Sequence, residues 1–375
     1  IRGLATYNGS GAIVIVDGIE RPDFGDIDPN EIENINILKD ASSTAIFGIR
    51  GANGVIIITT KGGKEGKIAV NLNMFYGMKK MANEIDVLDP EDFVKWQYEY
   101  ALLAKGNADS YEKYFVAWQD YDIYKGMKGD NWQKQIYGRK GEVQSRDLGI
   151  RGGSDKINFN FNYAHYDEKA IMVGSDFKRD NLSLALKSKA TDKIDLAFTM
   201  RYSNTEINGG GANEQNEVSS NDSRLKHSVG YSPLPMPGLT TDDTDEAVSG
   251  YLVNPFVAVA DNDREQFRKN FNMLGSFSWK LTDKLVFKTD LGLDNYNYLD
   301  NRFYGRSTYY VANKPAATLQ GMPALTMTDR KDVRFRNANT LNYDFKKIIG
   351  KDHSLKILVG EEMIDYSRND VSSTI

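Results

Sequence analysis

From Lys67 onward, hydrophobic and polar residues alternate along the chain with a period of two. In the clearest stretch, 157–163, Phe159 and Phe161 point to one side while Asn160 and Asn162 point to the other. The same alternation recurs in the segments 182–187, 195–202, 270–281, 341–345 and 355–359. The pattern predicts long strands that each have one apolar face and one polar face.

Alternation alone is compatible with a soluble β-sandwich or with a sheet whose apolar face meets lipid, and the lengths of the connections distinguish the two. Three turns share one formula and are minimal polar hairpins: Ser154–Ile157, Thr191–Ile194 and Thr282–Leu285. Other connections are long, at 81–141, 208–268 and 299–331, with 167–177 the shorter exception. Short turns at one rim and long loops at the other are typical of an outer-membrane barrel, in which the short turns face the periplasm.

The first 65 residues follow a different pattern and predict a small α+β domain. Ile13–Val16 is a short apolar strand that ends in an Asp17-Gly18 turn. Asp28 and Pro29 predict the N-cap and first turn of a brief helix, and the alternating residues around Ile35 and Ile37 predict a second strand. We expect the charged residues of this domain to meet a surrounding polar wall; they are Glu31, Glu33, Lys39, Asp40 and Arg50. For Lys39 and Asp40, solvated charges beside a helix cap are an equally good interpretation.

Within this domain, the segment 38–63 combines a strand end, a short turn of helix, a glycine-rich bend and a second strand. Asp40 is a suitable N-cap for the turn 41–47, and Gly48 can end that turn in a left-handed conformation. The run Val55–Thr60 is β-branched at nearly every position, which suits a strand buried on both faces. A nucleotide-binding loop is the alternative for these glycines. Their spacing argues against it, because they lead directly into a strand and no long helix follows them.

The segment LKDASSTAIFG at 38–48, followed by RGANGVIIITTK at 50–61, resembles the plug signature of the SusC/RagA family of TonB-dependent outer-membrane transporters. Further segments resemble sequence motifs of that family; these segments are 1–3, 13–18, 28–33, 131–133 and 254–258. The resemblance therefore covers the whole chain. The residues that carry the plug signature are Asp17, Gly18, Lys39, Asp40, Gly48, Arg50, Gly51, Asn53 and Gly54.

The resemblance implies a membrane β-barrel in part, with a small α+β plug domain. Residues 1–65 would be the C-terminal part of the plug, and residues 66–375 would be the N-terminal portion of the barrel. That portion would contain about nine antiparallel strands of a 22-stranded barrel. The long extracellular loops would span about 82–140, 208–267 and 299–330. The signal peptide and the TonB-contacting segment would lie upstream of Ile1.

By the same resemblance, the function is TonB-dependent import of an oligosaccharide or peptide across the cell outer membrane of a Bacteroidetes-type bacterium. The partners would be TonB, through a segment missing from this chain, a SusD-like surface lipoprotein, the glycan or peptide ligand and the lipid bilayer. Gating by the plug makes or breaks no covalent bond. Two alternatives remain open: a surface receptor or adhesin without transport, and a soluble α/β protein followed by a β-sandwich.

The composition of the chain argues against several kinds of partner and site. The 375 residues carry a formal net charge of −5, and no polybasic stretch suggests a nucleic-acid partner. No run of eighteen apolar residues predicts a transmembrane helix. The chain has no Cys, and its three histidines, His165, His227 and His353, stand far from one another. We therefore predict no enzyme, no cofactor and no metal site; the acidic run 242–246 is interpreted as a solvated surface.

The first long connection is predicted to contain helices. Asp89 and Pro90 begin one that carries Phe93, Trp96, Tyr100 and Leu103 along one side, and 111–124 would form another. Such a stripe favours packing against the loop's own core over contact with a ligand. The candidate ligand-facing aromatic residues of the loops are Trp118, Tyr121, Trp132, Tyr309 and Tyr310.

Two structural predictions follow. Arg50 is expected to pair with Glu361 or Glu362, which follow Gly360 at a place that resembles the family's Gly-x-Glu wall position. Since about nine strands cannot enclose a plug, the sheet should be open and curved, with the plug against its polar concave face. The apolar side chains on its other face should then be exposed; they are Phe159, Phe161, Phe198, Phe271 and Trp279.

Overall fold

The computed structural model describes residues 11–21, 24–40, 44, 51–209, 222–234, 252–313, 320–345 and 355–375. These residues form a four-stranded sheet and a nine-stranded sheet. We call the smaller sheet, with its short helix, the plug, and we call the larger sheet the wall. Arg50, Gly48, His353 and the acidic run 242–246 lie outside the described residues, so the predictions on them are not addressed by the structure.

The plug contains β1 (Ile13–Val16), β2 (Ile19–Arg21), β3 (Ile32–Leu38) and β4 (Val55–Thr60), in the order β2-β1-β4-β3. β1 runs parallel to β4, and the other pairs are antiparallel. The predicted helix is the 3₁₀ turn η1 (Pro29–Glu31), which Asp28 caps by accepting a hydrogen bond from the Asn30 amide at 2.7 Å. Val14, Val16, Ile27 and Ile58 form its small apolar core.

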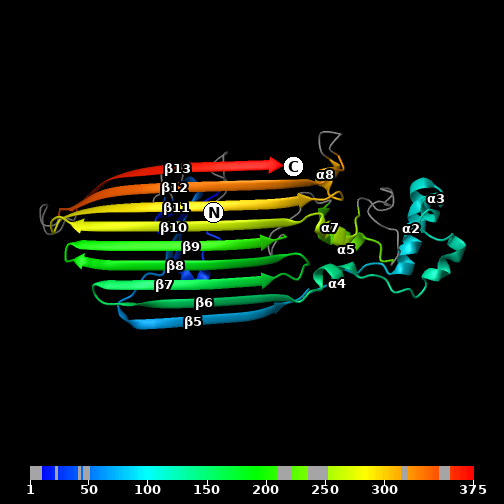
Figure 1. The fold of residues 1–375 in the computed structure, drawn as a ribbon, viewed down its shortest axis with the longest axis horizontal. Coiled ribbons are helices and arrows are strands. Elements are labelled where there is room, and N and C mark those ends of the chain that lie inside the picture. The colour runs from blue at the N-terminus through cyan, green and yellow to red at the C-terminus, as the bar shows by residue number, and fades with distance from the viewer. Residues whose placement is uncertain are drawn as a thin grey trace.

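The wall is built from nine long strands, each paired with its neighbours in sequence. They are β5 (Gly66–Lys79), β6 (Gly141–Gly153), β7 (Ile157–Lys169), β8 (Asp176–Thr191), β9 (Ile194–Asn208), β10 (Arg264–Lys280), β11 (Leu285–Tyr304), β12 (Ala324–Asp344) and β13 (Lys356–Thr374). All adjacent pairs are antiparallel, and β5 and β13 are the two edges (Figure 1). The predicted open sheet of about nine strands is confirmed.

The three short turns join wall strands as predicted, and a hydroxyl closes each of them. The side chain of Ser154 accepts hydrogen bonds from the amides of residues 156 and 157, each at 3.2 Å. Thr191 accepts from the Lys193 amide at 3.2 Å, and Thr282 accepts from the Lys284 amide at 3.2 Å. These local bonds satisfy the turn backbone, and the register of the flanking strands follows from them.

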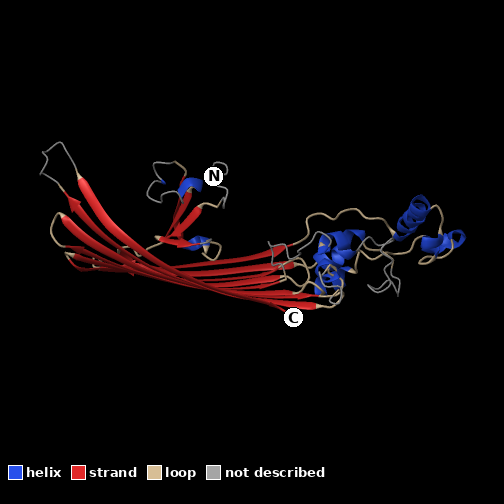
Figure 2. Cartoon of the chain, turned by 90° about the horizontal axis from the view of Figure 1, so that it is seen from above, coloured by secondary structure: helices blue, strands red, loops and turns tan. Residues whose placement is uncertain are grey.

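The wall is curved, and the plug lies on its concave side (Figure 2). Polar side chains of β7 to β10 and β12 meet the plug, so we call this side the inner face. On the opposite, outer face, Trp279 is 43% exposed, and the four predicted phenylalanines are partly exposed. Within the described residues no second sheet covers them. The β-sandwich alternative is therefore wrong, because it would bury these side chains.

The helices gather beyond one end of the wall, opposite the short turns (Figures 1 and 2). They are α2 (Pro90–Lys105), α3 (Asp109–Glu112), η3 (Trp118–Tyr124), α4 (Trp132–Tyr137), α5 (Arg224–Gly230), α7 (Pro255–Ala260) and α8 (Tyr309–Ala312). Asp89 caps α2 as predicted, accepting from the Asp92 amide at 2.8 Å. The single helix expected at 111–124 is wrong: only α3 and the 3₁₀ segment η3 form there.

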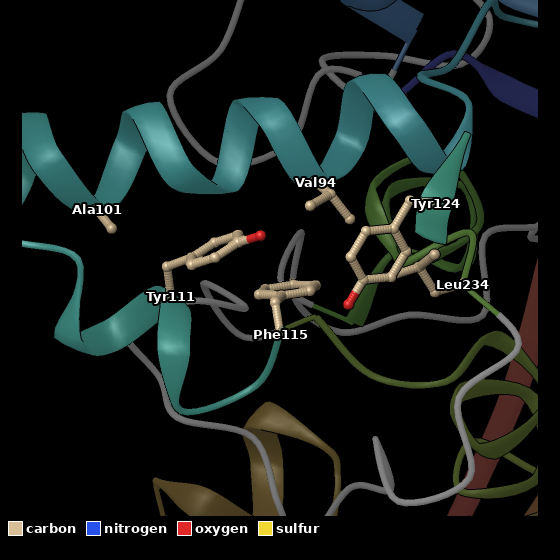
Figure 3. Close-up of a cluster of buried hydrophobic side chains, with 6 residues drawn as sticks. All are labelled: Val94, Ala101, Tyr111, Phe115, Tyr124 and Leu234. Atoms are coloured by element: carbon tan, nitrogen blue, oxygen red, sulfur yellow. The ribbon is translucent and has the colours of Figure 1, made fainter. Parts of the chain in front are cut away.

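The buried face of α2 also differs from the prediction. Val94 and Ala101 point into an aromatic cluster with Tyr111 and Phe115, as Figure 3 shows. The stripe that was expected to pack there is largely exposed, at 48% for Trp96, 43% for Tyr100 and 87% for Leu103. Phe93 does pack against the cluster, with its ring centroid 6.5 Å from that of Phe115. Trp96, Tyr100 and Leu103 are exposed because they lie on a neighbouring side of the helix. Val94, Gln97 and Ala101 define its buried side.

The third long connection is shorter than 299–330. β11 continues to Tyr304 and β12 begins at Ala324, so the connection spans only 305–323. The added residues continue the alternation of the strand pair, with Phe303, Leu325 and Met327 on the outer face and Arg302, Thr326 and Thr328 on the inner face. The prediction therefore ended these two strands too early.

Candidate functional site: the contact between plug and wall

Asp17 connects a turn of the plug to the wall. It follows β1 with a φ of 48°, and the next residue, Gly18, has a φ of 90°; glycine adopts this left-handed region at little cost and aspartate more readily than most residues. The turn directs the Asp17 carboxylate over β4, where it accepts the amide of Thr60 at 2.9 Å and its hydroxyl at 2.8 Å. The same carboxylate forms an ion pair with Arg201 of β9.

Glu31, at the end of η1, is a second carboxylate beside Arg201. Its Oε2 lies 3.7 Å from Arg201 Nε, and its Oε1 accepts a hydrogen bond from Asn162 of β7 at 3.3 Å. The Glu31 side chain is only 4% exposed. Burial raises the pKa of Glu31 above its ordinary value, and Arg201 and Asn162 oppose that shift by stabilising the charged form. Arg201 of the wall thus forms ion pairs with two carboxylates of the plug.

Asp26 is the centre of a second polar cluster. It forms an ion pair with Arg21 of the plug at 2.6 Å and accepts a hydrogen bond from Asn270 of β10 at 2.9 Å. Asn181 of β8 donates to the Asp26 carbonyl. One plug loop is therefore bound by two wall strands through amide side chains.

Wall side chains also donate to plug backbone carbonyls. Arg179 Nη1 donates to Gly25 at 2.7 Å, Arg334 Nη1 donates to Glu20 at 2.5 Å, and Asn160 Nδ2 donates to Lys61 at 3.0 Å. These bonds do not depend on the identity of the plug side chains. They hold the plug backbone against β7, β8 and β12.

One close apolar contact lies among these polar ones. Ile19 of β2 is 1% exposed, and it packs where Gly292 of β11 leaves room. A Cβ at position 292 would lie 3.1 Å from Ile19 Cδ1. Nearby, a gap of about 10 Å³, roughly the space of one water molecule, is left between Arg21, Asp26, Glu31 and the wall. The contact between plug and wall is therefore mainly polar and closely fitted.

The loops contain a second candidate site, an open pocket of about 410 Å³ between α2, α4 and α5. Its aromatic lining is Phe93, Trp96, Trp132 and Tyr231. Trp132 donates its indole N–H to the Ser232 carbonyl at 2.8 Å, which fixes one wall of the pocket. The pocket joins the first long connection to the second.

Of the residues in the plug signature, Asp17 makes the contact with the wall described above. Gly51 and Gly54 form the predicted bend, in which the Gly54 amide donates to the Gly51 carbonyl at 2.9 Å and Gly54 has a φ of 94°. Lys39, Asp40 and Glu33 are exposed, and their expected contact with the wall stays a prediction.

The predicted pairing of Arg50 cannot be followed, because Arg50 lies outside the described residues. Its two expected partners each have a neighbour within the wall. Arg336 Nε lies 2.5 Å from Glu362 Oε1, and Asn339 donates to Glu361 at 3.2 Å. The pairing stays a prediction.

The candidate loop aromatic residues have different surroundings. Trp118 stacks on Tyr98 with ring centroids 4.0 Å apart, and Tyr121 stacks on Trp118 at 4.8 Å. Trp132 lines the pocket. Tyr309 is 43% exposed, and Tyr310 stacks on Tyr304 at 4.1 Å. A role in ligand contact remains a prediction for all five.

Sequence reasoning did not single out Arg201, Asn162, Asn181 or Asn270. The alternation did assign Arg201, Asn162 and Asn270 to the polar side of their strands, which is the side that meets the plug. The sequence did not reveal the partner, because Arg201 and Asp17 are far apart along the chain and meet only where the plug packs against the wall.

The described residues contain no group of three or more His, Cys, Asp or Glu side chains placed to hold a metal ion. His165 Nδ1 lies 2.7 Å from Asp180 Oδ1, and His227 Nδ1 accepts from the Val253 amide at 3.1 Å. Over the same residues, no helix is both long enough and apolar enough to cross a membrane.

The sequence model of the TonB-dependent receptor plug domain matches residues 1–55. TonB-dependent receptor P3 of Formosa agariphila is 26% identical, over 96% of this chain and 33% of its own length. TonB-dependent receptor SusC of Bacteroides thetaiotaomicron is 27% identical, over 68% of this chain and 24% of its own length. The chain thus spans about a third or less of the length of these relatives.

Solved structures share the fold. The RagAB peptide transporter superposes with a TM-score of 0.73 at 19% identity, over 97% of this chain and 42% of that one. The ferric citrate transporter FecA in its unliganded form gives a TM-score of 0.54 at 10% identity, over 100% of this chain and 42% of that one. Together with the plug match and the curated relatives, this fold identifies the chain as a SusC/RagA-like TonB-dependent receptor, with a plug lying against part of a barrel wall.

Proposed function

We propose that the protein imports an oligosaccharide or peptide across the outer membrane, that TonB supplies the energy, and that a SusD-like surface lipoprotein assists from outside. The long connections and their helices would be extracellular and the short turns periplasmic. The single observation that carries the proposal is the polar contact between plug and wall, centred on Arg201, Asp17 and Glu31.

The polar contact supports gating because it can break and form again. A hydrogen bond within a protein contributes only about 0.5–1.5 kcal/mol net, because water replaces it when it breaks. A plug held by amides, guanidiniums and backbone carbonyls can therefore be pulled from the wall and hydrated at moderate cost. A plug held by a large apolar interface would resist displacement far more strongly. No step of this gating requires a covalent bond to be made or broken.

A reversible crosslink tests the proposal, and these 375 residues contain no Cys that would compete with an introduced pair. Lys61→Cys in the plug and Asn160→Cys in the wall would be joined in the full-length protein by a short bis-thiol linker that a reducing agent cleaves. These residues are in direct contact, with 3.0 Å between the Lys61 carbonyl and Asn160 Nδ2. Cells would be given a labelled maltodextrin mixture and a labelled casein digest.

We expect TonB-dependent uptake of one probe to stop on crosslinking and to return on reduction. The matched control joins Lys288→Cys to Thr340→Cys, which are direct neighbours on two wall strands and should leave uptake unchanged. Uptake that continues through a fully crosslinked plug would contradict gating by the plug. Surface binding without any TonB-dependent uptake would instead favour the receptor or adhesin.

A further inference from the structure

The inner face of β10 to β13 carries a concentration of arginines on the loop side of the plug contact. In one row of directly paired residues, Arg268 faces Tyr298, Tyr298 faces Arg330, and Arg330 faces Asp370. The neighbouring row contains Asn270, which binds Asp26 of the plug. Because alternate residues of a strand share a face, the arginine row faces the same interior space as that contact.

We call the inner-face side chains of four consecutive rows the arginine wall: this row, the neighbouring row that contains Asn270, and the two rows on its loop side. Its charged members are Arg264, Arg268, Arg302, Arg330, Arg368, Asp300, Asp332 and Asp370. Five guanidiniums thus stand against three carboxylates. Among the described residues of these rows, arginines outnumber carboxylates by two, although the whole chain has a net charge of −5.

The carboxylates of this surface are matched with good geometry. Arg264 contacts Asp300 through Nε at 2.9 Å and Nη2 at 2.8 Å. Arg368 contacts Asp332 in the same forked way, at 2.7 and 2.9 Å. Arg330 contacts Asp370 at 2.8 Å, so each of the three aspartates is matched with an arginine.

Tyrosine rings hold the guanidiniums in place. The guanidinium carbons of Arg268 on β10 and Arg330 on β12 each lie 5.9 Å from the centre of the Tyr298 ring, which lies between them on β11. Arg302 lies 4.8 Å from the ring of Tyr304. Stacking on an aromatic face orients the planar donor fork, so less entropy is lost when an acceptor binds.

We propose that the arginine wall recognises acidic groups, carboxylate or sulfate, on the imported oligosaccharide or peptide. The proposal rests on the transport function proposed above and assigns its substrate class. Guanidinium forks match both oxyanions in a two-pronged way, and such charge-assisted bonds are the strong ones. A ligand bound there would lie directly beside the row that holds the plug, between the loops and the plug.

The experiment measures binding to the full-length protein with three matched pairs of probes. They are tetragalacturonate and its methyl ester, a sulfated tetrasaccharide and its desulfated form, and tetra-aspartate and tetra-asparagine. We expect the acidic member of at least one pair to bind at least about tenfold more tightly than its neutral partner, with affinity falling as salt rises. The pair that shows this difference in affinity identifies the recognised group as a carboxylate or a sulfate, and the ligand as a glycan or a peptide.

Variants of the wall locate the effect. Arg268→Gln and Arg330→Gln should each lower the affinity for that acidic probe by about tenfold, and Arg268→Lys, which keeps the charge without the fork, by less. Lys288→Gln is the matched control, since it removes one positive charge from β11 toward the short turns. The thermal unfolding of each variant is measured alongside.

Three results would overturn the proposal: no acidic probe binds, neutral probes bind as tightly, or Arg268→Gln and Arg330→Gln lose no more than Lys288→Gln. Any of them would leave gating by the plug intact, since the crosslinking experiment does not depend on the charge of the probe. Conversely, acidic binding that disappears in the arginine variants would stand even if the plug proved not to gate.

Discussion

The contact between plug and wall and the core of the first long connection are both closely packed, but their chemistry is opposite. The plug meets the wall through charged and amide side chains, with Ile19 as a close apolar contact. The loop core is aromatic: Tyr111 stacks on Phe115 with ring centroids 5.0 Å apart, under Val94 and Ala101 of α2 (Figure 3). A contact that water can replace suits a part that moves, and an apolar core suits a part that stays in place.

The largest effect should come from removing an aromatic ring from the loop core. Tyr111 is 1% exposed, so Tyr111→Ala should destabilise the loop by about 4 kcal/mol, because a buried aromatic ring is lost and a cavity remains. Limited proteolysis of the full-length protein should then cut between 90 and 124. Tyr100→Ala is the control, since Tyr100 is 43% exposed and its loss should change little. Equal protease sensitivity in the two variants would show that the cluster is not a core.

The corresponding change at the plug should have a somewhat smaller effect. Arg201→Met leaves the carboxylates of Asp17 and Glu31 without their shared cation, which should cost about 3 kcal/mol of plug attachment. Faster hydrogen exchange in β1 and β4 would report this loss. Arg336→Met removes an arginine from the same face, but its partner Glu362 is 47% exposed, so it should cost less than about 1 kcal/mol. The comparison fails if the two substitutions release the plug equally.

A smaller effect is expected from the close apolar contact. Gly292→Ala places a Cβ 3.1 Å from Ile19 Cδ1, so the plug or the side chain must shift by a few tenths of an ångström. We expect a cost of about 1 kcal/mol, at the low end for overpacking, again measured by hydrogen exchange in the plug. Gly275→Ala on β10 has no heavy atom within 4 Å of its new Cβ and is the matched control. No difference between the two variants would mean that Ile19 is not closely held.

These two regions also show how far the sequence predicts the structure. Period-two alternation correctly assigned Arg201 and Asn162 to the polar face, because a strand whose one face is apolar carries its polar side chains on the opposite face. It could not pair Arg201 with Asp17, since that contact depends on how the plug sits on the curved wall. On α2, the aromatic spacing suggested the wrong buried side, because Val94 and Ala101 are smaller than the exposed Trp96 and Tyr100 and carry a weaker pattern.

The smallest effect should be a pH dependence that distinguishes the two regions. Because burial raises the pKa of Glu31, the packed plug binds its proton more tightly than the released plug does. The contribution of Glu31 to the attachment is therefore strongest below the ordinary Glu value of 4.5, and it weakens as the pH rises from that value through the raised pKa. After correction for intrinsic exchange rates, hydrogen exchange in the plug should accelerate over that window, and exchange in the aromatic loop core should not. Glu31→Gln should flatten the profile, whereas Glu33→Gln, at an exposed position, should leave it unchanged. Arg201→Met should extend the window to higher pH, because it removes the charge that opposes the shift. A plug that attaches more tightly as the pH rises would show that the cation outweighs burial at this site, and the contact would then be a conventional ion pair.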